Sequence, residues 1–343
     1  MFLENIPYQY YLLAFGVILL IKGGDWFVDA ATGIARRFKL PELLIGATVV
    51  SIGTTLPEVL TSAMAAASNN AATAYGNAIG SIICNTSLIA AITIAIKPAK
   101  ADKKTLIFPV SFFFGAAVFY SFCAYYFKSF PHWTGILLLV GFVVYMVINV
   151  LNMKKNPDEQ ELTGIEEHSD DATEQGAGSL SFVKDIGMLI VSAAVIAVGA
   201  HLLGDNAKWL AEVQLGIPGE IVSLTIVALA TSLPELVTAI TALAKGHGAL
   251  SLGNIIGANI FNLVLVSGAA ITIAPFDIPS GTQIMGQSAS LLIDVPLVFI
   301  TMGIMTIPTI IKGKLQRWQG ISLLAIYFSY VVFQVVMALA FAG

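Results

Sequence analysis

Charged residues are scarce in this chain: only 11% of its 343 residues are Asp, Glu, Lys or Arg, whereas 57% are hydrophobic. So little polar surface cannot cover a soluble globule of two or three domains. Cysteine is also rare, and Cys84 and Cys123 both lie inside apolar segments. We interpret them as packed small hydrophobes, so the sequence favours neither a disulfide framework nor a cysteine metal site.

Motifs of hydrolysis and of nucleotide binding are missing as well. The chain contains no G-x-S-x-G, no H-E-x-x-H and no nucleotide-binding loop. The sequence therefore gives little support to an intramembrane hydrolase or an ATP-driven pump. We expect a protein that is not an enzyme and that has neither a cofactor nor a nucleic-acid partner.

Long apolar stretches are abundant. A helix needs about 20 apolar residues to cross a hydrocarbon layer of roughly 30 Å, and ten stretches meet this requirement. We therefore expect an all-α membrane protein with ten transmembrane helices, arranged as two inverted five-helix repeats for the reasons given below. The first stretch lacks a basic leader and a cleavage site, so it is expected to be a retained span. The expected spans are 8 to 35, 41 to 67, 72 to 97, 105 to 127, 132 to 152, 182 to 204, 218 to 244, 249 to 274, 288 to 311 and 318 to 341.

The basic residues indicate how the chain crosses the membrane. The turns that follow even-numbered spans hold only Lys128 and Lys208, whereas the other turns hold many lysines and arginines. Basic turns face the cytoplasm, which predicts a multi-pass protein of the cell (inner) membrane with its N-terminus outside. Its partner is the lipid bilayer, and we expect a monomer.

One segment differs in composition from the rest of the chain. Residues 156–180 are mostly polar and rich in acidic side chains. We interpret them as a flexible cytoplasmic linker between an N-terminal half, 1–155, and a C-terminal half, 181–343. A regulatory cation site in the linker is the alternative interpretation.

An internal repeat relates the two halves. A shift of 177 positions aligns residues 41–90 with residues 218–267 without a gap, and 18 of the 50 pairs are identical. Five spans separate the starts of the two copies. Because five is an odd number, the copies cross the membrane in opposite directions. Such inverted repeats are typical of secondary transporters, which bind substrate near the bilayer midplane on interrupted helices.

The identical pairs include a proline followed by a glutamate, at Pro57 with Glu58 and at Pro234 with Glu235. Each proline lacks the N–H that its helix would need and pushes the preceding residue out of helical geometry. Free backbone oxygens at membrane depth are tolerated where they line a cavity or bind a partner. A cation suits a carbonyl oxygen beside a carboxylate.

Helical spacing gathers oxygen donors around this pair of glutamates. The expected lining contains no sulfur and no imidazole, which favours Ca²⁺ or Na⁺ over a transition metal. Glycines at positions 76, 80, 253 and 257 are expected to let the second helix of each copy approach its neighbour closely. The expected lining is Glu58, Glu235, Thr54, Thr55, Thr231, Ser232, Ser81, Asn85, Asn259 and Asn262.

Simpler interpretations exist for each acidic residue in a span. A single intramembrane glutamate can be protonated and hydrogen-bonded inside a bundle. Two glutamates at matched positions of an inverted repeat favour a functional role. Asp25, Asp29 and Asp294 lie near the ends of their spans, and we interpret them as interfacial helix caps.

The motifs GTTLPEVLTS with GNAIGSIICN, and ATSLPELVTA with GNIIGANIFN, resemble the two alpha repeats of the cation/calcium antiporter superfamily. Within it they look most like the sodium/calcium exchangers of bacteria and archaea. The resemblance implies that Glu58 and Glu235 bind Ca²⁺ with backbone oxygens of Thr54 and Thr231. It also implies that Na⁺ occupies overlapping and neighbouring positions. These would involve Ser81, Asn85 and Asn262.

Two positions depart from the family pattern. Residue 258 is alanine where the family commonly has serine, which puts one sodium position in doubt. Residue 262 is asparagine where the potassium-dependent branch has aspartate, which disfavours a potassium requirement. The expected function is exchange of Ca²⁺ for Na⁺ by alternating access. A Ca²⁺/H⁺ antiporter that uses the same two glutamates is the alternative, and a channel or a structural membrane protein belongs to a different class.

Overall fold

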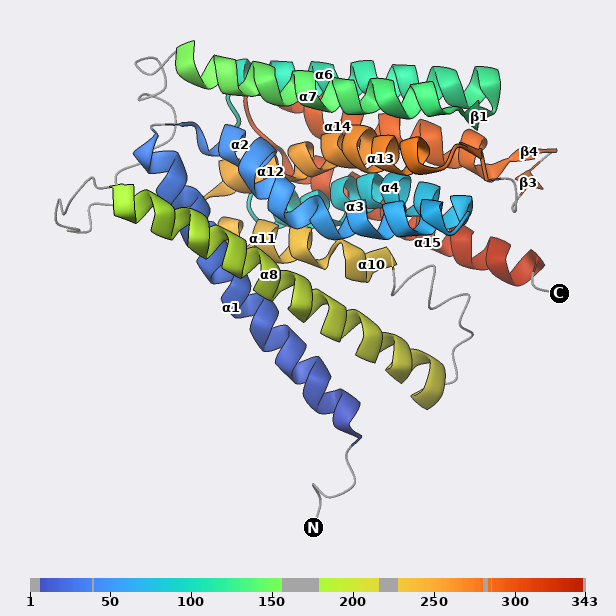
Figure 1. Cartoon of the computed structure of the whole chain (residues 1–343), viewed down its shortest axis with the longest axis horizontal. Helices are drawn as coiled ribbons and strands as arrows, with labels where there is room; N and C mark the ends of the chain where they lie inside the picture. Colours follow the sequence, from blue (N-terminus) through green and yellow to red (C-terminus); the bar gives the residue numbers. More distant parts are fainter. Residues whose placement is uncertain are drawn as a thin grey trace.

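The computed structural model describes residues 7–38, 40–155, 179–215, 228–279, 283–284 and 286–341. Figure 1 shows most of the long helices lying side by side, with α1 and α8 running obliquely along one side of the others. In the first half, with η denoting a π-helical stretch, the elements are α1 (Tyr8–Arg37), α2 (Glu42–Ile45), η1 (Gly46–Val50), α3 (Ser51–Ala67), α4 (Ala71–Cys84), η2 (Asn85–Ala90), α5 (Ala91–Ile96), α6 (Lys103–Phe122), η3 (Cys123–Phe127), β1 (Ser129–Phe130) and α7 (His132–Lys155). In the second half they are α8 (Ser179–Trp209), η4 (Leu210–Gln214), α10 (Ala228–Thr231), α11 (Leu233–Ala244), α12 (Gly248–Phe261), η6 (Asn262–Val266), α13 (Ser267–Ile273), β2 (Phe276–Asp277), β3 (Gln283–Ile284), β4 (Gln287–Ser288), η7 (Ser290–Asp294), α14 (Val295–Lys312) and α15 (Arg317–Phe341).

The predicted membrane fold is confirmed. In the part of the chain that the structure describes, nine helical stretches are long and apolar enough to cross a membrane, and they coincide with nine of the ten expected spans. The other expected span, 218–244, is described from residue 228 onward as α10 and α11. Residues 218–227 lie outside the described residues, as does the predicted linker except for Ser179 and Leu180, which begin α8.

The two copies of the repeat pair their helices in the same way where both are described. Helix α3 packs against α4, and α11 packs against α12. Each proline-bearing helix thus contacts the glycine-rich helix of its own copy. In the described residues, four strands of two residues each add two small antiparallel pairs to the all-α expectation: β1 pairs with β2, and β3 pairs with β4.

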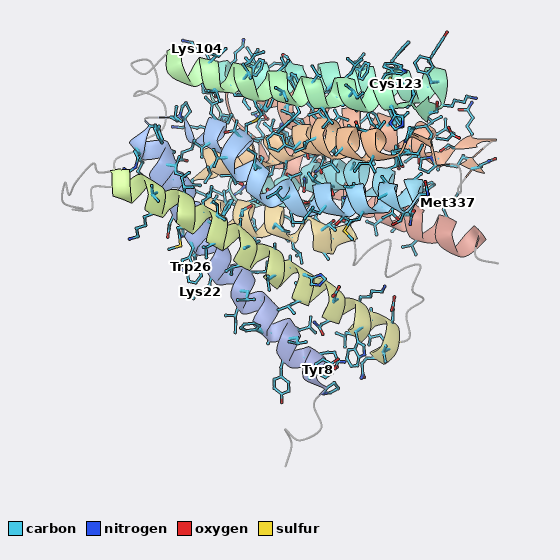
Figure 2. All side chains as sticks on the ribbon, viewed as in Figure 1. Tyr8, Lys22, Trp26, Lys104, Cys123 and Met337 are labelled. Atoms are coloured by element: carbon cyan, nitrogen blue, oxygen red, sulfur yellow. The ribbon has the colours of Figure 1, made fainter. Side chains whose placement is uncertain are left out.

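Apolar side chains cover the outside of the bundle, as lipid requires. Tyr8 at the N-terminal end of α1 and Trp26 further along the same helix (Figure 2) have 68% and 42% of their surfaces exposed. Cys84 and Cys123 are buried and unlinked, in agreement with their interpretation as packed hydrophobes.

Helix α12 connects the two halves through close backbone contacts. A Cβ atom at Gly253 would collide with the backbone of Leu43, and one at Gly257 would collide with Ser51 and Ala47. The predicted close approach is therefore confirmed for the second copy of the repeat. For the first copy it stays a prediction, because the repeat equivalents of Leu43 and Ala47 are residues 220 and 224, which lie outside the described residues.

The interpretation of three aspartates as helix caps is wrong. Asp29 and Asp25 on α1 instead surround the ammonium of Lys245, with Nζ to Oδ1 distances of 2.7 and 3.6 Å. Asp294 makes no side-chain cap at α14. Its Oδ1 accepts a hydrogen bond from the Tyr330 hydroxyl at 3.1 Å. The half-buried carboxylate of Asp294 needs such a partner, and helix-terminal N–H groups are only one source of partners.

Candidate functional site

The two repeat glutamates lie at the centre of the bundle and are completely buried. Glu58 is on α3 and Glu235 is on α11, so each copy of the repeat contributes one. The hydroxyl of Thr55 on α3 donates to Oε1 of Glu235 at 3.4 Å. This bond joins the motif of one copy to the glutamate of the other, and the two motifs therefore face each other.

Most oxygen atoms of the two carboxyl groups have no hydrogen-bond partner within the described structure. Both oxygens of Glu58 and Oε2 of Glu235 are buried and unpartnered. The two carboxyl groups are close enough to repel each other when ionised. Burial of charge without a partner is costly, so the arrangement has the chemistry of a site that a cation completes.

Amide and hydroxyl groups around the glutamates are unpartnered too. The side-chain nitrogen and oxygen of both Asn85 and Asn262, and the hydroxyl of Ser232, are buried without a described partner. The stretch η2 that begins at Asn85 packs against α11, and η6, which begins at Asn262, packs against α3. We call the set of Glu58, Glu235, Asn85, Asn262 and Ser232 the central polar cluster.

A π-helical stretch begins at each asparagine of the cluster. Asn85 starts η2 and Asn262 starts η6, and the two residues are equivalent in the repeat. Single π-helical turns inside α-helices occur frequently at functional sites, because they widen the turn and re-aim a side chain. The helices that carry the cluster are therefore irregular at matching points.

The helix break predicted at both prolines occurs in only one copy. In the second copy α10 ends at Thr231, Ser232 has φ −89° and ψ 6°, and α11 then begins with Pro234 in its first turn. In the first copy α3 continues through Pro57 without interruption. The prediction that the residue before each proline leaves helical geometry is therefore wrong: Leu56 lies inside α3, and Leu233 already belongs to α11, because the interruption in the second copy lies one residue earlier, at Ser232. Pro57 still provides no N–H for the carbonyl of Gly53.

Other predicted site residues take different positions. Thr54 is buried on α3, and Thr231 ends α10. Ser81 is buried one turn before Asn85, but no described hydrogen bond joins it to either glutamate. Asn259, included in the expected lining, donates instead to the hydroxyl of Thr86 at 2.7 Å.

Sequence reasoning missed a buried hydrogen-bond network beside the cluster. The side chain of Asn254 on α12 lies beside the hydroxyls of Ser51 and Thr54 on α3 and donates to Thr238 on α11. The repeat contained a signal for it, because Asn254 aligns with an identical residue, Asn77. Neither asparagine was included in the expected lining.

The chemistry of the central polar cluster suits a hard cation. Its potential ligands are carboxylate, amide and hydroxyl oxygens, which Ca²⁺ and Na⁺ prefer. The residues that the structure describes contain no group of three or more His, Cys, Asp or Glu side chains that could hold a metal ion. A transition-metal centre of that kind is thus absent from the described residues.

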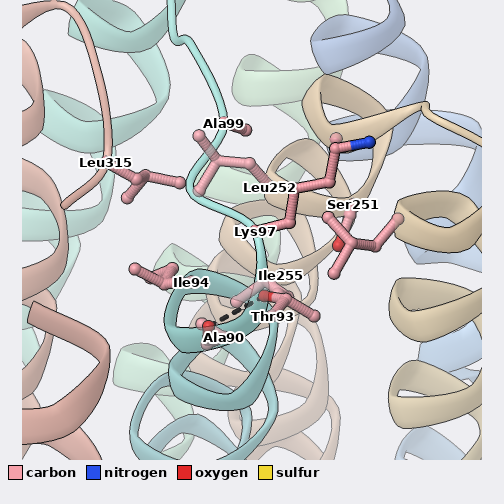
Figure 3. A pocket seen from close by; sticks show the side chains of 11 residues that line it. Ala90, Thr93, Ile94, Lys97, Ala99, Ser251, Leu252, Ile255 and Leu315 are labelled. Atoms are coloured by element: carbon pink, nitrogen blue, oxygen red, sulfur yellow. Dashed lines mark hydrogen bonds between the residues drawn. The ribbon is translucent and has the colours of Figure 1, made fainter. Parts of the chain in front are cut away.

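A small pocket lies elsewhere, beyond the end of α5 (Figure 3). Its walls come from α5, α11, α12 and the connection between α14 and α15, and the Thr93 hydroxyl on its wall donates to the carbonyl of Ala90 at 2.8 Å. Neither glutamate nor any other member of the central polar cluster lines it. The pocket residues are Ala90, Thr93, Ile94, Lys97, Ala99, Leu243, Gly248, Ser251, Leu252, Ile255 and Leu315.

Proteins of similar sequence are membrane proteins and exchangers. An uncharacterized membrane protein of Methanocaldococcus jannaschii is 34% identical over 327 residues, which cover 93% of this chain and 94% of that protein. The sodium/calcium exchanger MaX1 of Methanosarcina acetivorans is 29% identical over 354 residues, covering 95% and 98%. The inner membrane protein YrbG of Escherichia coli is 32% identical, covering 83% and 86%.

The fold has a solved counterpart. A structure of the sodium-calcium exchanger NCX_Mj, soaked with 2.5 mM Na⁺ and 1 mM Sr²⁺, superposes with a TM-score of 0.75 at 30% identity and covers 95% of this chain and 98% of that one. The profile of the sodium/calcium exchanger protein family matches residues 8–151 and 184–336, which span both halves. This chain belongs to the sodium/calcium exchanger family and is a multi-pass membrane protein.

Proposed function

We propose that this protein exchanges Ca²⁺ for Na⁺ across the cell membrane by alternating access, and that Glu58 and Glu235 form the cation site that the two ions share. The observation that carries the proposal is the pair of fully buried carboxyl groups with three unpartnered oxygen atoms. Membership of the exchanger family supports transport of these ions. The further proposed ligands are Thr54, Thr55, Thr231, Ser232, Ser81, Asn85 and Asn262.

Charge explains why such a site exchanges ions instead of leaking them. Two ionised carboxylates in a water-poor cavity carry a large desolvation penalty, which a closed gate would increase. One Ca²⁺ cancels the charge of Glu58 and Glu235, and two Na⁺ ions do so as well. The loaded forms can therefore reorient across the membrane, while the empty form is held back.

The arrangement of the chain in the membrane is part of the same proposal. The N-terminus lies outside, and the acidic segment 156–180 connects the two halves, 1–155 and 181–343, in the cytoplasm. The repeats at 41–90 and 218–267 supply the site, and one chain forms a complete transport unit. The distribution of lysine and arginine supports this orientation.

A Ca²⁺/H⁺ antiporter is the second candidate. Ala258 is completely buried and offers no hydroxyl where its repeat equivalent is Ser81, so the set of sodium ligands is smaller. Carboxyl pairs also bind protons in coupled steps. Protons could then replace Na⁺ as the counter-ion at Glu58 and Glu235.

Flux measurements in proteoliposomes separate the two candidates. We expect an imposed Na⁺ gradient to drive Ca²⁺ uptake at clamped pH, and we expect uptake to persist when a protonophore is present. Uptake that follows only a pH gradient and disappears with the protonophore would contradict Na⁺ coupling. Conductance of Ca²⁺ without a counter-ion would indicate a channel instead.

A further inference from the structure

Asn254 occupies the junction of three helices and is 1% exposed. It lies on α12, and its side chain reaches both α3 and α11, the helices that carry Glu58 and Glu235. All its described side-chain bonds go to hydroxyl groups. A hydroxyl can donate or accept, so the direction of each bond has to be worked out from the network.

Thr238 fixes the orientation of the Asn254 amide. The Thr238 hydroxyl donates to the backbone carbonyl of Pro234 at 2.9 Å, one turn earlier in α11. A hydroxyl has a single hydrogen, so towards Asn254 it can only accept. Asn254 Nδ2 accordingly donates to Thr238 Oγ1 at 2.9 Å. The amide oxygen Oδ1 must then point away from α11 and towards α3.

On α3, two hydroxyl groups approach this oxygen, and the Thr54 hydrogen is the one available to it. The single hydrogen of Ser51 has nearer acceptors in the backbone carbonyls of Gly46 at 2.8 Å and of Asn254 at 3.0 Å. Ser51 Oγ and Thr54 Oγ1 each lie 3.3 Å from Asn254 Oδ1. The Thr54 hydroxyl is also adjacent to the carboxyl group of Glu235. Its one hydrogen therefore has two possible acceptors. When the hydrogen points to Asn254, the Thr54 oxygen and the Glu235 carboxylate both present lone pairs to the space between them, which is what a hard cation requires.

We infer that Asn254 is a positioning residue, which draws the Thr54 hydroxyl hydrogen away from Glu235 and so leaves both oxygens free to bind the transported cation. This inference rests on the proposed function, because it concerns the same site. Asn254 acts through Thr54 and is not itself a ligand. Without its amide oxygen, Thr54 donates to Glu235 and occupies a lone pair that the cation needs.

The role depends on the neighbours of Asn254 and is not a property of the motif. Its repeat equivalent, Asn77, donates from Nδ2 to the backbone carbonyl of Glu58 at 3.0 Å and to Ser62 Oγ at 2.8 Å. Ser62 has alanine as its repeat equivalent, and so does Ser51. The two identical asparagines therefore support the two glutamates in different ways.

A double-mutant cycle tests the inference. Asn254→Leu removes the amide at similar volume, and Thr54→Val removes the hydroxyl. We expect each change to raise the KM for Ca²⁺ in Na⁺-driven uptake about tenfold, the size expected for loss of one hydrogen-bonded partner at a charged site. The double variant should have a KM no higher than that of the single variant with the larger effect. Effects that multiply would overturn the inference, since Asn254 would then act independently of Thr54.

Thr238→Val supplies a second variant that keeps Asn254 in place. It removes the acceptor that orients the amide, so the KM for Ca²⁺ should also rise. When Thr238→Val is combined with Thr54→Val, the KM should rise no further than in Thr54→Val alone. If Asn254→Leu gives no monodisperse protein, Thr238→Val replaces it in the double-mutant cycle. An unchanged KM in Thr238→Val would contradict the proposed orientation.

Asn149→Leu is the matched control. Asn149 is also completely buried, but its amide donates to the carbonyl of Tyr145 within its own helix, α7. We expect its KM for Ca²⁺ to match that of the wild type. If wild-type uptake proves to be driven by protons instead of Na⁺, the proposed coupling fails, and the same cycle measured in proton-driven uptake still decides the role of Asn254.

Discussion

Thr55 on α3 donates its hydroxyl hydrogen to Glu235 on α11, across the boundary between the two repeats, at an Oγ1 to Oε1 distance of 3.4 Å. The bond orients one oxygen of a carboxyl group whose other oxygen has no described partner. Thr55→Val should therefore raise the KM for Ca²⁺ at least about tenfold, since a hydrogen bond to a charged group contributes about 1.5–3 kcal/mol. Thr55→Ser keeps the hydroxyl and should retain most of the affinity. Equal losses in the two variants would show that packing, and not the hydrogen bond, explains the effect.

Neutralising either glutamate should abolish exchange. Glu58→Gln and Glu235→Gln each leave a single negative charge in the site. One Ca²⁺ or two Na⁺ ions would then give the loaded site a net positive charge. We expect the rate of Na⁺-driven Ca²⁺ uptake to fall at least about 30-fold, corresponding to about 2 kcal/mol, the lower end of the cost of removing one member of a buried charge pair. Glu212→Gln is the control, because Glu212 lies in η4 beside Lys208 with 31% of its side chain exposed. Normal uptake in either site variant would contradict the shared-site proposal.

The glycine contacts of α12 lead to a prediction about stability. Gly257→Ala places a methyl group against Ser51 and the backbone of Ala47, and overpacking of this kind costs about 1–3 kcal/mol. The thermal unfolding midpoint of the detergent-purified protein should fall. Gly76→Ala is the repeat-matched control. It meets open space in the described structure and should leave the midpoint unchanged or raise it slightly, because alanine favours helix. A lower midpoint in Gly76→Ala alone would contradict the prediction.

Tyr330 is expected to stabilise the fold through Asp294. Tyr330→Phe removes the hydroxyl that donates to the carboxylate at 3.1 Å, and the loss should cost about 1–3 kcal/mol. Thermal unfolding measures this change, and Tyr8→Phe serves as the control because 68% of Tyr8 is exposed. If the two variants unfold at the same temperature, Asp294 gains its stabilisation from another group.

The sequence was sufficient to predict the fold class and to bring the two repeat glutamates into one candidate site. Apolar length alone predicts membrane spans, because lipid leaves the backbone no alternative hydrogen-bond partners. The repeat then brought Glu58 and Glu235 into one hypothesis, and the structure places them on facing helices. Both predictions depend on features that are local or periodic in the chain.

What the sequence could not predict depends on contacts between the copies. Pro57 and Pro234 occupy identical motifs, yet only the second copy is interrupted, at Ser232. Proline sterics disfavour helical geometry at the preceding residue, and tertiary packing decides whether the helix is interrupted. Asn77 and Asn254 differ for the same reason, because the side chains around them are not conserved between the repeats.

Ion density between Glu58 and Glu235 is the most direct test of a shared cation site. Crystals of this protein soaked with Ca²⁺ should show one strong peak in contact with both carboxyl groups, and a second soak with excess Na⁺ should replace it with weaker density in overlapping positions. Calcium bound at any other place, with the space between the two glutamates empty, would contradict the account.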